Sequence, residues 1–114
     1  MPCIIIRTNQ KISEQQKLLT CQSTSALISS LLAKPERYVM AIMEHPVSMT
    51  MAGTNEPAAY IELKSINLPE QQTTELSRQI CQYISKQLDI NGQRIYIEFS
   101  NVQRHLWGWD SKTF

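Results

Sequence analysis

The residue at position 2 raises the first question about chemistry. The chain begins MPCIIIRTN, so Pro2 stands directly before an apolar run from Cys3 to Ile6 that predicts a buried strand. If Met1 is removed, the nitrogen of Pro2 becomes a secondary amine at the mouth of that strand, with its conformation restricted by the ring. Taken alone, a proline at this position indicates only that the initiator methionine is removed. A catalytic role for Pro2 therefore needs support from other residues.

Other residues of chemically useful types are scattered along the chain, and each has an ordinary structural explanation. Lys34, near the end of a predicted helix, is favourably placed at the negative end of the helix dipole. Tyr96 and Trp109 are typical of core or interface aromatics. His45 and His105 lack the spacing of metal ligands. The chain has no Gly-x-Ser-x-Gly, no phosphate-binding glycine-rich loop and no His-Glu-x-x-His, so no common hydrolase, nucleotide or zinc-protease motif is present.

Length and charge predict one ordinary domain spanning residues 1–114. The 11 basic and 10 acidic residues give a net charge of +1 without a basic cluster, so we expect no nucleic-acid partner. The first apolar run is too short for a membrane helix and lacks the features of a signal peptide, so we expect no membrane partner and a cytoplasmic location. Three cysteines without Cys-x-x-Cys spacing predict neither disulfides nor structural zinc.

The first half of the chain predicts a strand, a helix and a strand. Residues 3–8 and 37–44 read as the strands, and the helix between them begins after Ser13, with Gln16 completing a capping box. Pro35 ends this helix near Ala33 or Lys34, because the residue before a proline is disfavoured in the α region. The expected apolar stripe of the helix comprises Leu18, Cys21, Ser25, Ile28 and Leu32.

The second half repeats this plan about 56 residues later, as a comparison of Cys3 with Ala59 and Glu14 with Glu70 shows. Residues 58–66 and 94–100 predict strands, residues 68–88 predict a helix, and residues 44–57 predict a loop or a short hairpin. The helix has an apolar stripe at i, i+4 spacing: Leu76, Ile80, Ile84 and Leu88. Two βαβ units predict an α/β fold, with a four-stranded mixed sheet and both helices on one face.

The other face of this sheet has no predicted cover. The strands CIII, YVMAIM and IYI are apolar with little alternation, which is typical of strands buried on both sides. We therefore expect an apolar open face that associates with identical subunits.

The whole chain resembles the macrophage migration inhibitory factor family of the tautomerase superfamily. The resemblance is carried by the segments MPCIIIRTN, AKPERYV, EPAAYIELKSI, RIYIEFS and GWDSKTF. It implies two βαβ repeats, a homotrimer whose sheets surround a central channel, and active sites at the subunit interfaces. It also implies that no cofactor is needed.

The resemblance implies keto–enol tautomerisation of a phenylpyruvate-like aromatic α-keto acid, with Pro2 as general base and then general acid. The pKa of the Pro2 amine must then be low, and the nearby ammonium of Lys34 would lower it. The residues that the resemblance assigns to substrate binding are Lys34 and the backbone N–H of Ile66 for the carboxylate and oxygen, Tyr96 from the adjacent subunit, Trp109 and Phe114 as pocket walls, and Cys3 beside the base.

Two features of the sequence depart from well-known members of the family. Glu98 stands two residues after Tyr96, where those members have asparagine, and an ionised carboxylate cannot donate a hydrogen bond. Substrate preference is therefore open, and a solvated carboxylate at a strand end is an equally simple interpretation of Glu98. The vertebrate cytokine has a Cys-x-x-Cys where this chain has Ala58 and Ile61, so we expect no thiol-disulfide oxidoreductase activity.

Two alternatives remain open at this stage. The chain could be a cytokine-like ligand that engages a receptor or host protein with a vestigial pocket, since family members can leave cells without a signal peptide and a fold does not determine function. It could also be an unrelated ferredoxin-like oligomer, although the matching segments at both ends of the chain argue against this.

Overall fold

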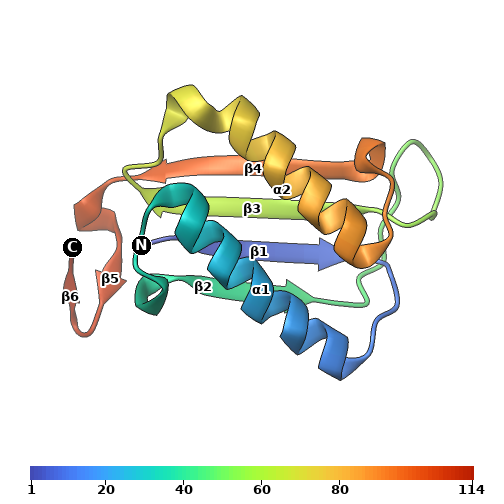
Figure 1. The fold of residues 1–114 in the computed structure, drawn as a ribbon, viewed down its shortest axis with the longest axis horizontal. Coiled ribbons are helices and arrows are strands. Elements are labelled where there is room, and N and C mark those ends of the chain that lie inside the picture. Colours follow the sequence, from blue (N-terminus) through green and yellow to red (C-terminus); the bar gives the residue numbers. More distant parts are fainter.

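The computed structural model describes residues 1–114 and contains a four-stranded sheet in the order β2-β1-β3-β4. Both helices cover one face of the sheet, and a short hairpin lies beside the chain termini at one end of it (Figure 1). The elements are β1 (Cys3–Thr8), α1 (Glu14–Leu32), β2 (Met40–Glu44), β3 (Ala59–Ile66), α2 (Thr73–Leu88), β4 (Ile95–Val102), β5 (Gly108–Trp109) and β6 (Lys112–Thr113).

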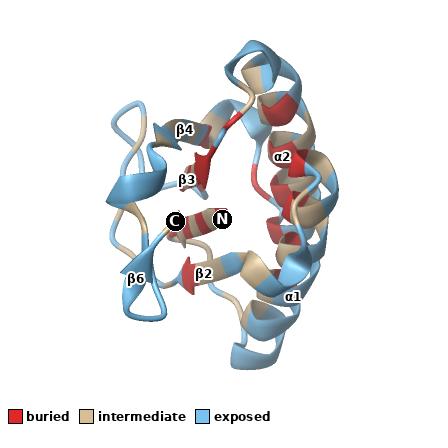
Figure 2. Ribbon diagram, turned by 90° about the vertical axis from the view of Figure 1, so that its left-hand side faces the viewer, coloured by how far each residue is buried: buried red, intermediate tan, exposed pale blue.

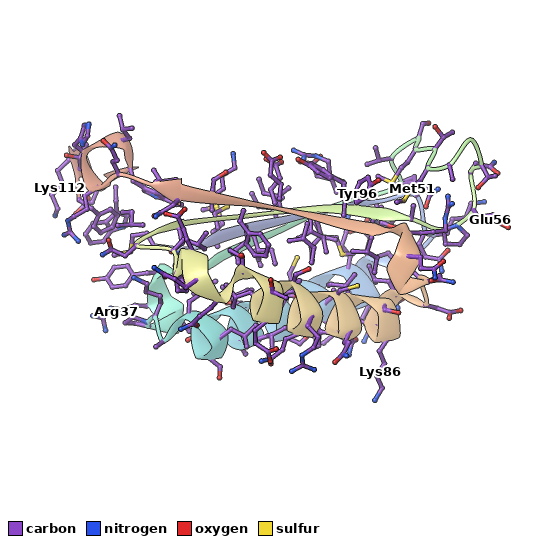
Figure 3. The ribbon with its side chains drawn as sticks, turned by 90° about the horizontal axis from the view of Figure 1, so that it is seen from above. Arg37, Met51, Glu56, Lys86, Tyr96 and Lys112 are labelled. Carbon is purple, nitrogen blue, oxygen red and sulfur yellow. The ribbon has the colours of Figure 1, made fainter.

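The sheet is mixed. Strands β1 and β2 are parallel, β1 and β3 are antiparallel, and β3 and β4 are parallel. Each parallel pair is connected by one helix, so the two predicted βαβ units and the mixed sheet are confirmed. Seen along the sheet, α1 and α2 lie on one side, whereas Tyr96 projects from the other (Figure 3).

Helix α1 begins and ends where the sequence predicts, but it buries a different face. The Ser13 hydroxyl accepts a hydrogen bond from the Gln16 N–H at 3.0 Å, and Ala33 ends the helix in the left-handed region at φ 52°. The predicted stripe beginning at Leu18 is wrong in part, because Leu18 is 60% exposed. The residues buried against the sheet are Thr20, Thr24, Ile28 and Leu32.

Helix α2 buries the predicted stripe in full, and this stripe completes the core between helices and sheet. Its four members, Leu76, Ile80, Ile84 and Leu88, are each at most 2% exposed. They pack with Ile4 and Ile6 of β1 and with Ile61 and Leu63 of β3. Figure 2 shows these buried segments facing one another across the gap between the sheet and α2.

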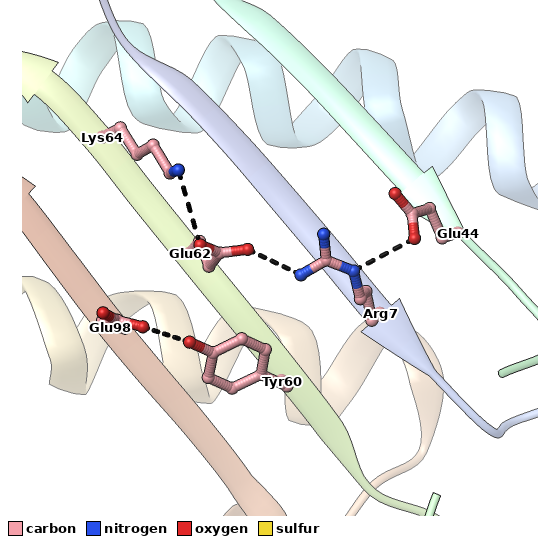
Figure 4. Close-up of polar contacts among 6 residues, drawn as sticks. All are labelled: Arg7, Glu44, Tyr60, Glu62, Lys64 and Glu98. Atoms are coloured by element: carbon pink, nitrogen blue, oxygen red, sulfur yellow. Dashed lines mark hydrogen bonds and ion pairs between the residues drawn. The ribbon is translucent and has the colours of Figure 1, made fainter. Parts of the chain in front are cut away.

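The open face of the sheet is more polar than the sequence predicts. Burial alternates strictly along β1, so every second side chain faces away from the helices. Arg7 bonds Glu44 at 3.0 Å and Glu62 at 2.6 Å, and Lys64 lies 3.6 Å from Glu62 (Figure 4). The expectation of an apolar open face is therefore wrong for this region, where ion pairs partly compensate the charges.

The start of β2 also differs from the prediction. Residues 36–38 form a single turn of 3-10 helix after Pro35, so the strand begins at Met40 rather than at Arg37. This turn directs Tyr38 toward the end of the sheet.

The predicted loop between β2 and β3 is confirmed, and one arginine organises it. The Arg94 guanidinium donates four hydrogen bonds of 2.9–3.2 Å to backbone carbonyls of residues 51–57. Asn9 adds contacts to the same loop through both atoms of its amide group. No helix of the chain is long and apolar enough to cross a membrane.

Candidate active site

A cavity of about 280 Å³ lies at the end of the sheet where the two termini meet. Three separate segments form it: the start of the chain, the turn that precedes β2, and the C-terminal hairpin. Its lining residues are Met1, Pro2, Cys3, Arg37, Tyr38, Val39, Met40, Trp107, Gly108, Trp109 and Phe114.

The topology explains why these distant segments meet. Because β1 and β2 are parallel, α1 returns the chain to the end at which β1 begins, and Lys34 follows α1 at that end. Because β3 is antiparallel to β1, with Lys64 opposite Cys3, β3 terminates there with Ile66. Strand β4 runs parallel to β3, so the residues after Val102 start from the same end.

Pro2 is fixed at the inner side of the cavity. Its side chain is fully buried, and its carbonyl accepts a hydrogen bond from the Met40 N–H at 3.0 Å. This bond extends the pairing of β1 with β2 by one residue beyond the strand. The backbone at the N-terminus is therefore held by the sheet.

Three aromatic rings form one wall of the cavity. Tyr38 meets Trp109 edge-to-face at 5.6 Å between ring centroids and meets Phe114 in the same way at 6.3 Å. Trp109 and Phe114 stack at 5.4 Å with an angle of 11° between their planes. A backbone hydrogen bond of 3.2 Å from the Phe114 N–H to the Trp107 carbonyl holds the hairpin closed. The wall offers a flat apolar surface to a planar ligand.

The electrostatics of the cavity disfavour a protonated amine. Burial lowers the pKa of the Met1 amine below its ordinary value, and the positive charges of Lys34 and Arg104 lower it further. This end of the sheet therefore favours the neutral form of an amine, which is the form that can accept a proton.

Cys3 lines the cavity as a protonated thiol. Burial raises the pKa of the Cys3 thiol, and the nearby carboxylate of Glu62 raises it too, whereas Lys64 acts in the opposite direction. A thiol with a raised pKa is a poor nucleophile. Cys3 therefore contributes surface to the cavity rather than reactivity.

The structure brings together only some of the site residues that the sequence analysis names. Pro2, Cys3, Trp109 and Phe114 line the cavity. Lys34 does not line it but is close enough to affect the N-terminal amine.

The other three candidates do not line the cavity of their own chain. Ile66, at the end of β3, is only 3% exposed. Tyr96 pairs with Tyr60 at the opposite end of the sheet and is 64% exposed. Glu98 lies on the open face, where its carboxylate accepts the hydroxyl hydrogen of Tyr60 (Figure 4). Tyr96 and Glu98 therefore cannot complete the cavity of their own chain.

Sequence reasoning missed several lining residues. Tyr38 is central to the aromatic wall, and its signal was present in AKPERYV, four residues after Lys34. Trp107 was detectable as the first aromatic of the triplet WGW. Arg37 and Met40 carry no local signal for a cavity, because only the turn at residues 36–38 brings them to it.

No cluster of three or more histidine, cysteine or carboxylate side chains could hold a metal ion. The arrangement consists of a buried proline at a chain terminus, a flat aromatic wall and nearby cations. A flat apolar wall beside cations suits a planar, negatively charged ligand.

Comparisons with known proteins agree over the full chain. The sequence profile described as "Macrophage migration inhibitory factor (MIF)" matches residues 1–114. A macrophage migration inhibitory factor homologue of Trichinella spiralis is 30% identical, covering 100% of both chains, and the factor of Mus musculus is 29% identical, covering 100% of this chain and 99% of its own.

Solved structures give the same result. The homologue from Prochlorococcus marinus superposes with a TM-score of 0.91 at 39% identity, covering 98% of each chain. The factor from Trichinella spiralis superposes with a TM-score of 0.90 at 28% identity, covering 98% of this chain and 99% of its own.

Proposed function

Because this chain belongs to the macrophage migration inhibitory factor family, we propose that it is a keto–enol tautomerase of phenylpyruvate-like aromatic α-keto acids, with Pro2 as the catalytic base. The observation that carries the proposal is the position of Pro2, which is buried and fixed by the sheet at the inner side of an aromatic-walled cavity.

The chemistry requires the removal of Met1. While Met1 is attached, the nitrogen of Pro2 belongs to an amide and has no basic electron pair. After removal, this nitrogen is a secondary amine held close to the position of the present terminus. The influences that lower the pKa of the Met1 amine, namely burial and the charges of Lys34 and Arg104, would then act on the Pro2 amine.

A single group, the Pro2 amine, carries out both proton transfers of the proposed reaction. The neutral Pro2 amine removes a proton from the carbon next to the ketone of the substrate, and the resulting secondary ammonium gives a proton to the oxygen to form the enol. The reverse direction follows the same steps. Lys34 and the backbone N–H of Ile66 are the proposed partners of the carboxylate and of the oxygen that becomes negative, so they stabilise the charge that develops.

The aromatic wall supports the proposed substrate class. A phenyl ring can pack against Trp109 and Phe114, whose planes differ by only 11°, and such stacking adds to the burial of apolar surface. An aliphatic α-keto acid would leave this wall uncovered.

We further propose that the active form is a homotrimer with shared sites. Tyr96 lies exposed on the open face, away from its own cavity, so it is free to reach the cavity of a neighbour. The pairing of Glu98 with Tyr60 keeps that carboxylate from facing the substrate freely. A mass measurement in solution, repeated for Tyr96→Ala, tests this assembly.

The test of the function compares two variants with the processed wild type. Phenylpyruvate ketonisation is followed by ultraviolet absorbance on protein whose intact mass shows that Met1 is absent. We expect Pro2→Gly to lower kcat/KM by about 10²-fold or more, within the range typical of a general base.

The matched control extends the chain by one alanine before Pro2, which retains every side chain but converts the amine to an amide. It should be as inactive as Pro2→Gly. Undiminished turnover by either variant would disprove the role of Pro2, and absence of turnover in the processed wild type would disprove the proposed activity.

A further inference from the structure

Four cationic side chains lie around the cavity, and none of them pairs with an aspartate or glutamate. They are Lys34, Arg37, Arg104 and Lys112. The acidic residues of the same segments, Glu36 and Asp110, are likewise unpaired. Arg104 donates a hydrogen bond of 3.2 Å to the oxygen of Phe114 at the C-terminus. The ion pairs elsewhere in the chain are made by four cations: Arg7, Lys17, Lys64 and Arg78.

Arg37 is exceptional among the five arginines of the chain. Arg7, Arg78, Arg94 and Arg104 each donate at least one hydrogen bond to another residue, whereas the guanidinium of Arg37 donates none. It is positioned instead by the Tyr38 ring, whose centroid lies 4.8 Å from its central carbon. Arg37 therefore lines the cavity with all its donors free.

Lys112 is held in a similar way on the other side of the aromatic wall. Its ammonium lies 4.7 Å from the centroid of the Trp109 ring. Figure 3 places Arg37 and Lys112 at the same end of the molecule, with Arg37 toward the helix side and Lys112 toward the open face. The wall thus carries a cation at each margin, in addition to Lys34 and Arg104 near the amine.

The proposed monoanionic substrate compensates only one of these charges. Lys34 is its assigned partner, which leaves Arg37 and Lys112 beside the part of the cavity that receives the ring. A planar guanidinium with free donors matches a carboxylate, which it can bind through two parallel hydrogen bonds. The second carboxylate of a dianionic ligand would accept hydrogen bonds from the Arg37 guanidinium. It would also reduce the repulsion among the cations.

We propose that the cavity prefers dianions, namely planar aromatic or unsaturated keto acids that carry a second carboxylate, which Arg37 binds at the margin of the aromatic wall. This inference rests on the proposed function for the reacting end of the substrate. Its binding component does not depend on turnover and can be measured separately.

The probes are 4-carboxycinnamate and 4-carbamoylcinnamate, which have nearly the same shape and differ by one negative charge. Titration calorimetry with the processed full-length protein should give about tenfold tighter binding of the dicarboxylate at low ionic strength. The preference for the dicarboxylate should shrink as salt is added, because charges at the margin of the aromatic wall are open to solvent and are screened by salt.

The decisive variant is Arg37→Gln, and Lys86→Gln is its control, since Lys86 is exposed on the outer side of α2 (Figure 3). The preference for the dicarboxylate should fall below about threefold in Arg37→Gln and stay at its wild-type value in Lys86→Gln. Equal binding of both probes by the wild type, a preference that persists in Arg37→Gln, or no binding of either probe at millimolar concentration would each overturn the inference.

Kinetics separate this inference from the proposed function. If the wild type turns over phenylpyruvate but shows no gain in kcat/KM with 4-carboxyphenylpyruvate, only the dianion preference fails. If neither substrate is turned over while the dicarboxylate probe still binds through Arg37, the tautomerase proposal fails and the anion site remains.

Discussion

Replacing Tyr38 with leucine should loosen the aromatic wall of the cavity. Tyr38 makes edge-to-face contacts with Trp109 and Phe114 and carries the Arg37 guanidinium on its ring. Each aromatic pair is worth about 0.5–1.5 kcal/mol beyond area burial, and a cation–π contact at an exposed site about 0.5–1 kcal/mol. Tyr38→Leu should therefore lower the free energy of unfolding by about 2 kcal/mol.

A double-mutant cycle isolates the contact itself. Urea unfolding of the wild type, Tyr38→Leu, Trp109→Leu and the double variant at one fixed protein concentration should give a coupling energy of about 1 kcal/mol. The control cycle pairs Trp109 with Tyr83, which lies on α2 and donates its hydroxyl to Ser23. That second cycle should be additive to within about 0.5 kcal/mol.

The same variant links the wall to binding. If the wall receives the substrate ring, Tyr38→Leu should raise the KM for phenylpyruvate more than it lowers kcat, because the ring contacts are made equally before and during proton transfer. A coupling between Tyr38 and Trp109 within about 0.3 kcal/mol of zero would refute the reasoning that these rings support each other.

Two further predictions concern the core and the open face of the sheet. Ile80→Ala should lower the free energy of unfolding, measured in urea, by about 2–5 kcal/mol, because Ile80 is fully buried. Leu18→Ala, at a 60% exposed position, should change it by less than about 0.5 kcal/mol. Equal losses in the two variants would contradict the burial pattern. The hydrogen bond to Glu98 raises the pKa of Tyr60, because the neutral hydroxyl donates to the carboxylate, so Glu98→Gln should shift the ultraviolet titration of Tyr60 to lower pH. An unchanged titration would mean that the two side chains do not interact in solution.

The two helices show why some of the fold was predictable from the sequence and some was not. In α2, large aliphatic residues at i, i+4 spacing leave one possible buried face, and the structure buries it. In α1, leucines occur on several sides, and the buried face includes Thr20 and Thr24. A threonine can pack through its methyl group, so hydrophobicity alone did not identify that face.

The prediction of an apolar open face was wrong for a related reason. Isoleucines at successive positions of β1 conceal its alternation, since Ile4 and Ile6 face the helices while Ile5 shares the other face with Arg7. The cross-strand pairing of Arg7 with residues of β2 and β3 depends on register, which one sequence does not reveal.

The site was predictable only through resemblance. Residues 103–114 have no helical or strand periodicity, so nothing local predicts that Trp109 and Phe114 return to the N-terminus. Nothing local predicts the role of Tyr96 either, because the cavity that we propose it completes belongs to another chain. The sequence-based hypothesis nonetheless named four residues that line a single cavity, although they come from opposite ends of the chain.

The repeat explains why the proposed chemistry belongs to only one half of the molecule. With the offset of about 56 residues, the counterpart of Pro2 is Ala58 and that of Lys34 is Ile90, which are 1% and 2% exposed. Ala58 is tied by both backbone groups, since its N–H donates to Asn9 and its carbonyl accepts from Thr8. An internal residue keeps its nitrogen in an amide, so the second unit cannot supply a basic amine. The duplicated βαβ frame positions the terminus, and only the free terminus can carry the base.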